Sequence, residues 1–253
     1  MDKIVELKSV SKNFGKGFSL DSISFSIGRG EIVGYLGPNG AGKTTTIKLL
    51  MNALRKDSGS ISFMGKNIEK DETLFRKHIG YMPENGTPFE FLTAREYLEF
   101  VSGAYGIDKK KIRGKIDELL SIFSLTEEKK SVRTFSKGMK QKLLFLSAII
   151  HNPDLLILDE PFNAIEPQTA MLMKNLIYEM KQDGKAVIFS SHVLEIVEKL
   201  ADKVILLNNG KIVGEGFVSS LKSRGGLDGF FRELIDSSNI DENTVKIIQT
   251  IKS

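Results

Sequence analysis

The sequence contains no cysteine, which excludes both a disulfide framework and a cysteine-liganded zinc site. A reducing compartment fits this composition. Long hydrophobic runs are also absent: the longest, near residues 143–150, is far shorter than the roughly 18 residues that a membrane-spanning helix needs. The charged N-terminus, residues 1–6, does not resemble a signal peptide. We therefore expect a soluble chain, whose role at any membrane would depend on a partner.

Charge of one sign is in only slight excess. The chain has 36 basic and 32 acidic residues, a formal net charge of +4, and the two signs are mixed along its length. This distribution predicts no nucleic-acid partner. The 253 residues and the hydrophobic fraction of 41% suffice for one large globular domain or two small ones.

A glycine-rich segment at residues 37–45 matches the pattern G-x-x-x-x-G-K-[ST], between an apolar run and a helical pattern. In such a loop, successive backbone N–H groups converge on a phosphate at the start of the helix. Lys43 can reach the β- and γ-phosphates, and the hydroxyl of Thr44 can hold Mg²⁺. A glycine-rich turn that binds nothing is the alternative, but it would not need the lysine–threonine pair. The expected nucleotide-binding residues are Gly37, Pro38, Asn39, Gly40, Ala41, Gly42, Lys43, Thr44 and Thr45.

Two adjacent carboxylates follow a second apolar segment, residues 155–158. Ligands of α/β proteins bind at the carboxyl ends of parallel strands, where we expect Asp159 and Glu160 to lie. Asp159 can hold Mg²⁺ through water, and Glu160 can polarise an attacking water as general base. The alternative is a solvated strand end with acidic caps. The phosphate loop earlier in the chain favours the catalytic interpretation.

A third polar segment opens an apolar helix after Ser136. Ser136 is a suitable N-cap, but Lys137 and Lys140 put positive charge in the first turn, where the helix dipole opposes it. An anion that docks at this helix start would explain the composition. A poorly charged helix start is the alternative.

Strand and helix patterns alternate along the chain. Short strands with turns occupy residues 3–36, helices dominate from about 93 to 150, and strand–helix alternation then resumes. Thr93 and Glu96 form a capping-box pattern where the helical stretch begins. This order predicts the α/β class with a mainly parallel sheet covered on both faces. The tail after about residue 220 is polar and weakly patterned.

Together these segments resemble the nucleotide-binding subunit of an ATP-binding cassette (ABC) transporter over most of residues 3–220. Residues 37–45 are similar to its Walker A motif and residues 155–160 to its Walker B motif. Ser136-Lys137-Gly138-Met139 stands at its signature motif, usually Leu-Ser-Gly-Gly-Gln, and His192 stands at its switch histidine. The order and spacing of the motifs agree with this family.

The resemblance implies a fold and a division of the chain. The expected α/β architecture is an ABC ATPase domain, with a P-loop RecA-like core, an antiparallel β subdomain and an inserted α-helical subdomain. The nucleotide-binding domain would comprise residues 1–220, with the helical subdomain at about 89–150. Residues 221–253 would form a C-terminal extension.

The resemblance also implies a mechanism in which two such domains meet head to tail with two ATP molecules between them. The signature residues of one copy, Ser136, Lys137, Gly138 and Met139, would then meet the ATP held by the other. His192 would bond the γ-phosphate and orient Glu160 and its water. A lone histidine after a strand is otherwise more often a local cap.

Three further residues, an aromatic residue and two histidines, are compared with the family pattern. Phe14 matches the aromatic residue that stacks on adenine, although a phenylalanine of the core is the alternative. His78 and His151 have no such context, and we expect both to be structural.

The chain departs from the family pattern at several positions. The signature has Lys137 and Met139 where glycine and glutamine are usual, and Glu166 replaces the usual aspartate after the Walker B motif. Glu84 stands where a glutamine usually touches Mg²⁺; a carboxylate can also do so, but it adds negative charge. The signature residues and the Pro83-Glu84 pair resemble the ABC-2-type branch of exporters, which move drugs, lipids or other amphiphiles.

The resemblance implies a motor subunit that uses ATP and Mg²⁺, pairs with a second nucleotide-binding subunit and drives an integral membrane permease. It would be cytoplasmic and peripheral on the inner face of the cell membrane. A soluble ABC ATPase acting on ribosomes or DNA is the main alternative. Ribosome-type members usually carry two cassettes, and DNA-repair types carry a long coiled coil; this chain has neither pattern. A small-molecule kinase is a third possibility, but it would leave the signature helix and His192 unused.

Two aromatic residues, Phe89 and Phe91, precede the expected helix start at Thr93. Aromatic side chains in a loop are typical of interface anchors. In the transporters that this sequence resembles, the corresponding segment forms a groove for a short cytoplasmic helix of the membrane subunit. The alternative is that both rings pack beneath the helical insertion.

Overall fold

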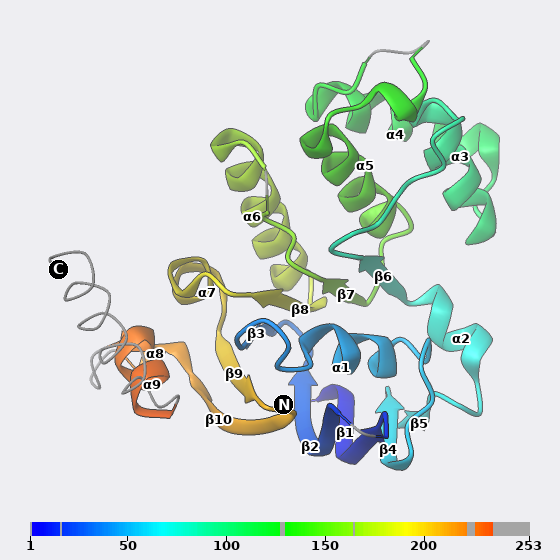
Figure 1. Cartoon of the computed structure of the whole chain (residues 1–253). Helices are drawn as coiled ribbons and strands as arrows, with labels where there is room; N and C mark the ends of the chain where they lie inside the picture. Colours follow the sequence, from blue (N-terminus) through cyan, green and yellow to red (C-terminus); the bar gives the residue numbers. More distant parts are fainter. Residues whose placement is uncertain (1, 16, 127–129, 164, 222–225, 235–253) are drawn as a thin grey trace, which may run out of the picture.

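The computed structural model of the chain describes residues 2–15, 17–126, 130–163, 165–221 and 226–234 (Figure 1). At its centre is a six-stranded sheet. Its strands are β3 (Ile32–Leu36), β6 (Ile79–Met82), β7 (Leu155–Leu158), β8 (Ala186–Ser191), β9 (Lys203–Asn208) and β10 (Lys211–Phe217). They lie in the order β10-β9-β3-β8-β7-β6, and all neighbours pair in parallel except β9 and β10. The predicted, mainly parallel sheet is thus confirmed.

The sheet is covered on both faces, which explains why its inner strands are apolar throughout. Every residue of β3, β7 and β8 is buried. Along β7 the side chains alternate between two cores: Leu155 and Ile157 belong to one, Leu156 and Leu158 to the other. At the edge of the sheet, β9 and β10 form a hairpin, in which Asn209 and Gly210 both have the positive φ of a tight turn (46° and 75°).

A second sheet is antiparallel and packs against one face of the six-stranded sheet. It contains β1 (Lys3–Asn13), β2 (Ser19–Gly28), β4 (Ser58–Phe63) and β5 (Lys66–Asn67), in the order β2-β1-β4-β5. Helix α1 (Lys43–Leu50) belongs to the same buried cluster: Ile47 of α1, Leu7 of β1 and Tyr35 of β3 are all at most 1% exposed. This packing fixes the start of α1 at the carboxyl end of β3.

The other face carries a group of helices inserted between β6 and β7 (Figure 1). They are α3 (Ala94–Ala104), α4 (Lys109–Ile122), the 3₁₀ helix η1 (Val132–Thr134) and α5 (Lys137–Ile149). The predicted capping box is present: the Thr93 side chain accepts a hydrogen bond from the Glu96 N–H, and the Glu96 carboxylate accepts one from the Thr93 N–H. Ser136 caps α5 by accepting a hydrogen bond from the Met139 N–H. Both helix starts therefore agree with the sequence.

The remaining helices are α2 (Glu72–Lys77), α6 (Pro167–Gln182), α7 (Leu194–Leu200), α8 (Val218–Leu221) and α9 (Gly226–Leu234). Two of them depart from the sequence analysis. Helix α2 has no strong pattern and was not expected. Helix α9 lies in the tail that looked weakly patterned, yet its Leu227 and Phe230 are buried beside α7 and α8. Part of the expected C-terminal extension, residues 222–225 and 235–253, lies outside the described residues.

None of the helices in the described part of the chain combines the length and the apolar character needed to cross a membrane.

Candidate active site

The loop at residues 37–45 connects β3 to α1 and requires glycine at particular points. A Cβ on Gly37 would lie 2.3 Å from the main-chain oxygen of Leu207, and one on Gly42 would lie 2.6 Å from the Phe18 ring. Gly42 also has a positive φ of 109° and stands directly before the first residue of α1. The loop is therefore pressed against the end of β9, and its free N–H groups stand at the start of a helix.

The side chain of Lys43 is folded back into the loop. Its side chain is only 8% exposed, and its ammonium donates hydrogen bonds to the main-chain oxygens of Gly37 (2.6 Å) and Pro38 (3.3 Å). Glu160 lies 3.8 Å away from it, at Oε1. A buried cation needs such partners. Phosphate oxygens at the loop would offer the same ammonium stronger, charged acceptors.

Thr44 and Asp159 link the loop to the end of β7. The Thr44 hydroxyl donates to Asp159 Oδ2 (2.9 Å), and the Ser190 hydroxyl donates to Asp159 Oδ1 (2.6 Å). Ser190 also accepts a hydrogen bond from the Glu160 N–H (2.8 Å). Ser190 thus orients both carboxylate-bearing residues. The sequence analysis missed it because its role depends on β8 lying beside β7.

Glu160 and His192 form the second pair of the site. His192 Nδ1 lies 2.9 Å from Glu160 Oε2, while the Glu160 side chain is 8% exposed and that of His192 is 50% exposed. Glu160 has a left-handed backbone (φ 48°), which turns the chain sharply at the strand end. A buried carboxylate beside an accessible imidazole is an arrangement suited to holding and polarising a water molecule.

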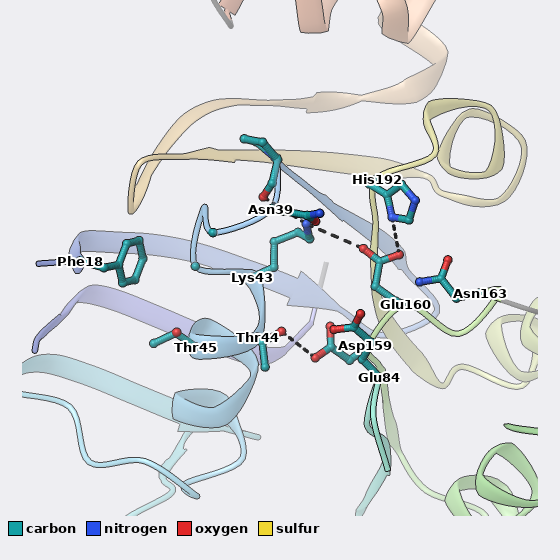
Figure 2. Close-up of a pocket in the computed structure, with 13 residues that line it drawn as sticks. Phe18, Asn39, Lys43, Thr44, Thr45, Glu84, Asp159, Glu160, Asn163 and His192 are labelled. Atoms are coloured by element: carbon teal, nitrogen blue, oxygen red, sulfur yellow. Dashed lines mark hydrogen bonds and ion pairs between the residues drawn. The ribbon is translucent and has the colours of Figure 1, made fainter. Parts of the chain in front are cut away.

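These residues surround one cavity of about 610 Å³ (Figure 2). The cavity is lined by Phe18, Pro38, Asn39, Gly40, Gly42, Lys43, Thr44, Thr45, Glu84, Asp159, Glu160, Asn163 and His192. It thus brings together most of the phosphate-loop residues and all of the expected metal and catalytic residues. Gly37 and Ala41 belong to the loop but are not among the residues that line the cavity.

Two lining residues, Phe18 and Asn163, were not singled out from the sequence. Phe18 matters because it lies close to Phe14, the expected adenine-stacking residue: their ring centroids are 6.5 Å apart. Phe14 itself is 52% exposed and does not line the cavity. Stacking by Phe14 therefore stays a prediction, and Phe18 is a second candidate for the same contact.

The signature residues lie apart from this cavity. Ser136, Lys137, Gly138 and Met139 form the start of α5, and none of them lines the cavity. The cavity of one copy is therefore formed without the signature residues. Their role toward a second copy stays a prediction.

The donors around the cavity fit a magnesium ion held together with phosphates. Thr44, Asp159 and Glu84 offer hydroxyl and carboxylate oxygens, which Mg²⁺ prefers. Among the described residues, no group of three or more His, Asp or Glu side chains is arranged to hold a metal by itself. Mg²⁺ here would need phosphate oxygens and water as its other ligands, which is its usual mode in nucleotide sites.

The other two histidines have structural contacts. His78 Nδ1 lies 2.6 Å from Asp154 Oδ2. His151 stacks flat on Tyr105, with ring centroids 3.6 Å apart, and its Nε2 lies 3.0 Å from the Ile79 main-chain oxygen. Neither residue lines the cavity.

Comparison with known proteins decides which phosphate-loop family this is. The pattern of the ABC transporter family matches residues 20–163, more than half of the chain. The chain belongs to the ABC transporter family. This ABC transporter chain is 36% identical over 250 residues to the bacitracin transport ATP-binding protein BcrA of Bacillus licheniformis, covering 98% of this chain and 79% of BcrA. It is 34% identical over 237 residues to the linearmycin resistance ATP-binding protein LnrL of Bacillus subtilis, covering 93% and 76% respectively.

A solved structure of an ATP-binding subunit of an ABC transporter has the same fold. Its TM-score is 0.85 at 30% sequence identity, and the match covers 91% of this chain and 99% of that one. The related sequences are longer: the matched part is 64% of the length of one relative and 79% of another. The expected ABC ATPase fold is thereby confirmed, and the resemblance is to transporter subunits rather than to ribosome- or DNA-associated ATPases.

Proposed function

We propose that the chain is the ATP-hydrolysing motor subunit of an ABC exporter. The observation that carries this proposal is the meeting of Lys43, Thr44, Asp159, Glu160 and His192 around one cavity. These are the groups that phosphate binding, metal binding and water activation require. The names of BcrA and LnrL, which refer to bacitracin transport and linearmycin resistance, favour an exporter of amphiphilic compounds.

Each residue has a distinct task in this proposal. Lys43 leaves the carbonyls of Gly37 and Pro38 and pairs with the phosphates. Thr44 and Asp159, which are hydrogen-bonded to each other, would hold Mg²⁺ with their oxygens, and the ion would supply charge compensation for the phosphates. Glu160 accepts a proton from the attacking water, and His192 fixes the carboxylate through the contact at 2.9 Å.

A second copy, identical or related, would complete each site. The start of α5 has N–H groups and the exposed Lys137, but no acidic residue lies in its first turn. A phosphate held by a partner copy would satisfy this helix end. Ser136, Gly138 and Met139 would share in that contact.

The membrane partner would dock on an aromatic surface of the helical insertion. Phe89, Phe91 and Phe100 are 44%, 79% and 55% exposed, and the Phe89 ring contacts the other two at centroid distances of 5.8 and 5.2 Å. Exposed aromatic rings that contact one another are typical of interface anchors. Their position after the Glu84 loop would link the permease to the nucleotide site. The chain would then lie at the inner face of the membrane, in the cytoplasm.

Phosphate release from MgATP by the purified chain tests the proposal. Lys43→Ala removes the cation from the phosphate loop and is expected to abolish most of the turnover. Lys48→Ala is the matched control, because Lys48 is an exposed lysine of the same helix α1. Equal rates for the parent and Lys43→Ala would show that the ATP site has been assigned wrongly.

A further inference from the structure

Gln141 is a buried polar residue of helix α5 whose side chain bonds to the loop after β6. Gln141 is 4% exposed, and its amide nitrogen donates a hydrogen bond to the main-chain oxygen of Glu84 (3.1 Å). Its other polar atom, Oε1, is buried and has no hydrogen-bond partner. A buried acceptor without a partner destabilises the fold, so the presence of an amide here calls for an explanation beyond packing.

The residue that Gln141 holds is part of the active site. The Glu84 side chain lines the cavity with Asp159 and Glu160. Gln141 itself stands little more than one helical turn after Ser136, the cap of the signature helix. One hydrogen bond therefore joins the ATP site of this copy to the helix start that is expected to meet the ATP of the other copy.

A second contact ties the far end of the same loop to the neighbouring residue of α5. Lys140 Nζ lies 2.6 Å from Glu90 Oε1, and the Glu90 main-chain oxygen accepts a hydrogen bond from the Arg133 N–H. The loop from Glu84 to Glu90 is thus anchored at both ends to adjacent residues of one helix.

Between the two anchors the loop spans free space. A cavity of about 270 Å³ is lined by residues 84–87 on one side and by Lys137, Lys140, Gln141 and Leu144 on the other. Gln141 lines this space and bonds to the first residue of the loop, so a change in the path of the loop would alter its contact with Glu84.

We propose that Gln141 is a positioning residue that couples Glu84 at the ATP site to the signature helix, so that nucleotide bound in one copy sets the helix presented to the other. This inference rests on the proposed function. It adds a residue that touches neither ATP nor metal, and acts through Glu84 on one side and Ser136 on the other. Loss of the hydrogen bond between Gln141 and Glu84 should leave nucleotide binding intact and should slow ATP hydrolysis, which needs both copies.

The variant Gln141→Met tests this, since methionine keeps the length and volume of the side chain but cannot hydrogen-bond in this way. We expect kcat for MgATP to fall about tenfold, equivalent to about 1.4 kcal/mol, with KM and the melting temperature close to those of the parent. Ser147→Ala is the matched control: Ser147 is also a buried polar residue of α5, but it bonds to Leu144 of the same helix and to Tyr97 of α3, and not to the loop after β6.

A second readout follows the helix directly and does not depend on turnover. The chain has no cysteine, so Thr134→Cys, an exposed position just before α5, can carry a single fluorescent probe. At concentrations where light scattering detects only monomer, MgATP should change the probe signal in the parent background and leave it unchanged with Gln141→Met. Should Gln141→Met not fold, Gln141→Leu, which is also apolar and has no hydrogen-bonding group, is measured by the same criteria.

The outcomes separate this inference from the proposed function. A parent chain that binds no MgATP would overturn the proposed function and with it this inference. A functional parent whose kcat and probe response are both retained in Gln141→Met would overturn the inference alone. An equal loss of kcat in Ser147→Ala would also overturn it, because any disturbance of α5 would then have the same effect.

Discussion

Glu160 and His192 meet across the mouth of the active-site cavity, with Oε2 of the carboxylate 2.9 Å from Nδ1 of the imidazole. The two residues follow neighbouring parallel strands, β7 and β8, so the sheet itself brings them together. The second carboxylate oxygen of Glu160 lies 3.8 Å from the Lys43 ammonium. Glu160 is thus held between the group expected to bind phosphate and the group expected to sense it.

Glu160→Gln should retain ATP affinity and lose most turnover, by about 100-fold or more, because the amide cannot accept a proton from water. The ATP-bound form should accumulate as a dimer, detectable by light scattering with and without MgATP. Glu179→Gln, at an exposed position of α6, is the control. A monomer in both conditions, also after co-expression with a related cassette, would contradict the two-copy site.

His192→Ala should lower kcat while leaving the melting temperature nearly unchanged, since half of the His192 side chain is exposed and it packs little. The loss should be smaller than for Glu160→Gln, because Glu160 stays in place and loses only its orienting partner. Steady-state hydrolysis and thermal unfolding of the same samples provide the comparison. If the double variant Glu160→Gln/His192→Ala is much slower than Glu160→Gln alone, then His192 acts independently of Glu160.

The sequence predicted the parts of this site that are local in the chain. The phosphate loop, the Asp159–Glu160 pair and the Ser136 cap are each short patterns whose chemistry depends on adjacent residues. Contacts between segments that are distant in the sequence could not be predicted in this way. Ser190 bonds to Asp159 across 31 positions, and Gln141 bonds to Glu84 across 57, and both contacts depend on how strands and helices pack.

The secondary structure shows the same difference between elements fixed by local patterns and elements that depend on tertiary packing. The Thr93 capping box is a four-residue pattern and was found, whereas α9 was missed because its stability comes from Leu227 and Phe230 packing on α7 and α8. Phe18 was not identified from the sequence, because its place beside the cavity depends on the path of the chain between β1 and β2, which no local pattern fixes.

Glu84→Gln should leave ATP binding largely intact and should make hydrolysis less dependent on Mg²⁺ concentration and on pH. The reason is that Glu84 shares the cavity with Asp159 and Glu160, and a glutamine removes one negative charge and one titratable group from it. Mg²⁺ titrations and pH–rate curves of the two forms provide the test. Curves that superimpose would show that Glu84 does not face the metal during turnover.

Phe89→Ala and Phe91→Ala should weaken co-purification with the membrane subunit while basal hydrolysis and thermal stability stay nearly unchanged. Both rings are exposed, so truncation should cost little folding free energy. Phe217→Ala, at an exposed aromatic residue of β10, is the matched control and should co-purify normally. Full recovery of the complex with both variants would show that the two rings do not contact the membrane subunit. A marked loss of stability in either variant would show that the ring serves packing within the chain.

The last prediction concerns His151, which joins the helical insertion to the edge of the sheet. Burial lowers the pKa of His151 from 6.5 to about 4; the hydrogen bond to the Ile79 oxygen opposes this shift, and Lys115 and His78 add to it. The unfolded chain therefore binds a proton at this residue between about pH 6.5 and pH 4, whereas the folded chain does not. Stability from this group is complete above pH 6.5 and is lost as the pH falls toward 4.

His151→Gln keeps an N–H for the Ile79 oxygen but does not titrate, so it isolates this effect. The variant should be less stable than the parent at about pH 7.5, because it loses the stacking of the imidazole on Tyr105. Between about pH 7.5 and pH 5, however, the parent should lose more free energy of unfolding than the variant, since only the parent gains the proton on unfolding. Urea denaturation at the two pH values measures both differences. Equal losses in the two proteins would mean that the imidazole is protonated in the folded state, and that its contact with Tyr105 survives the charge.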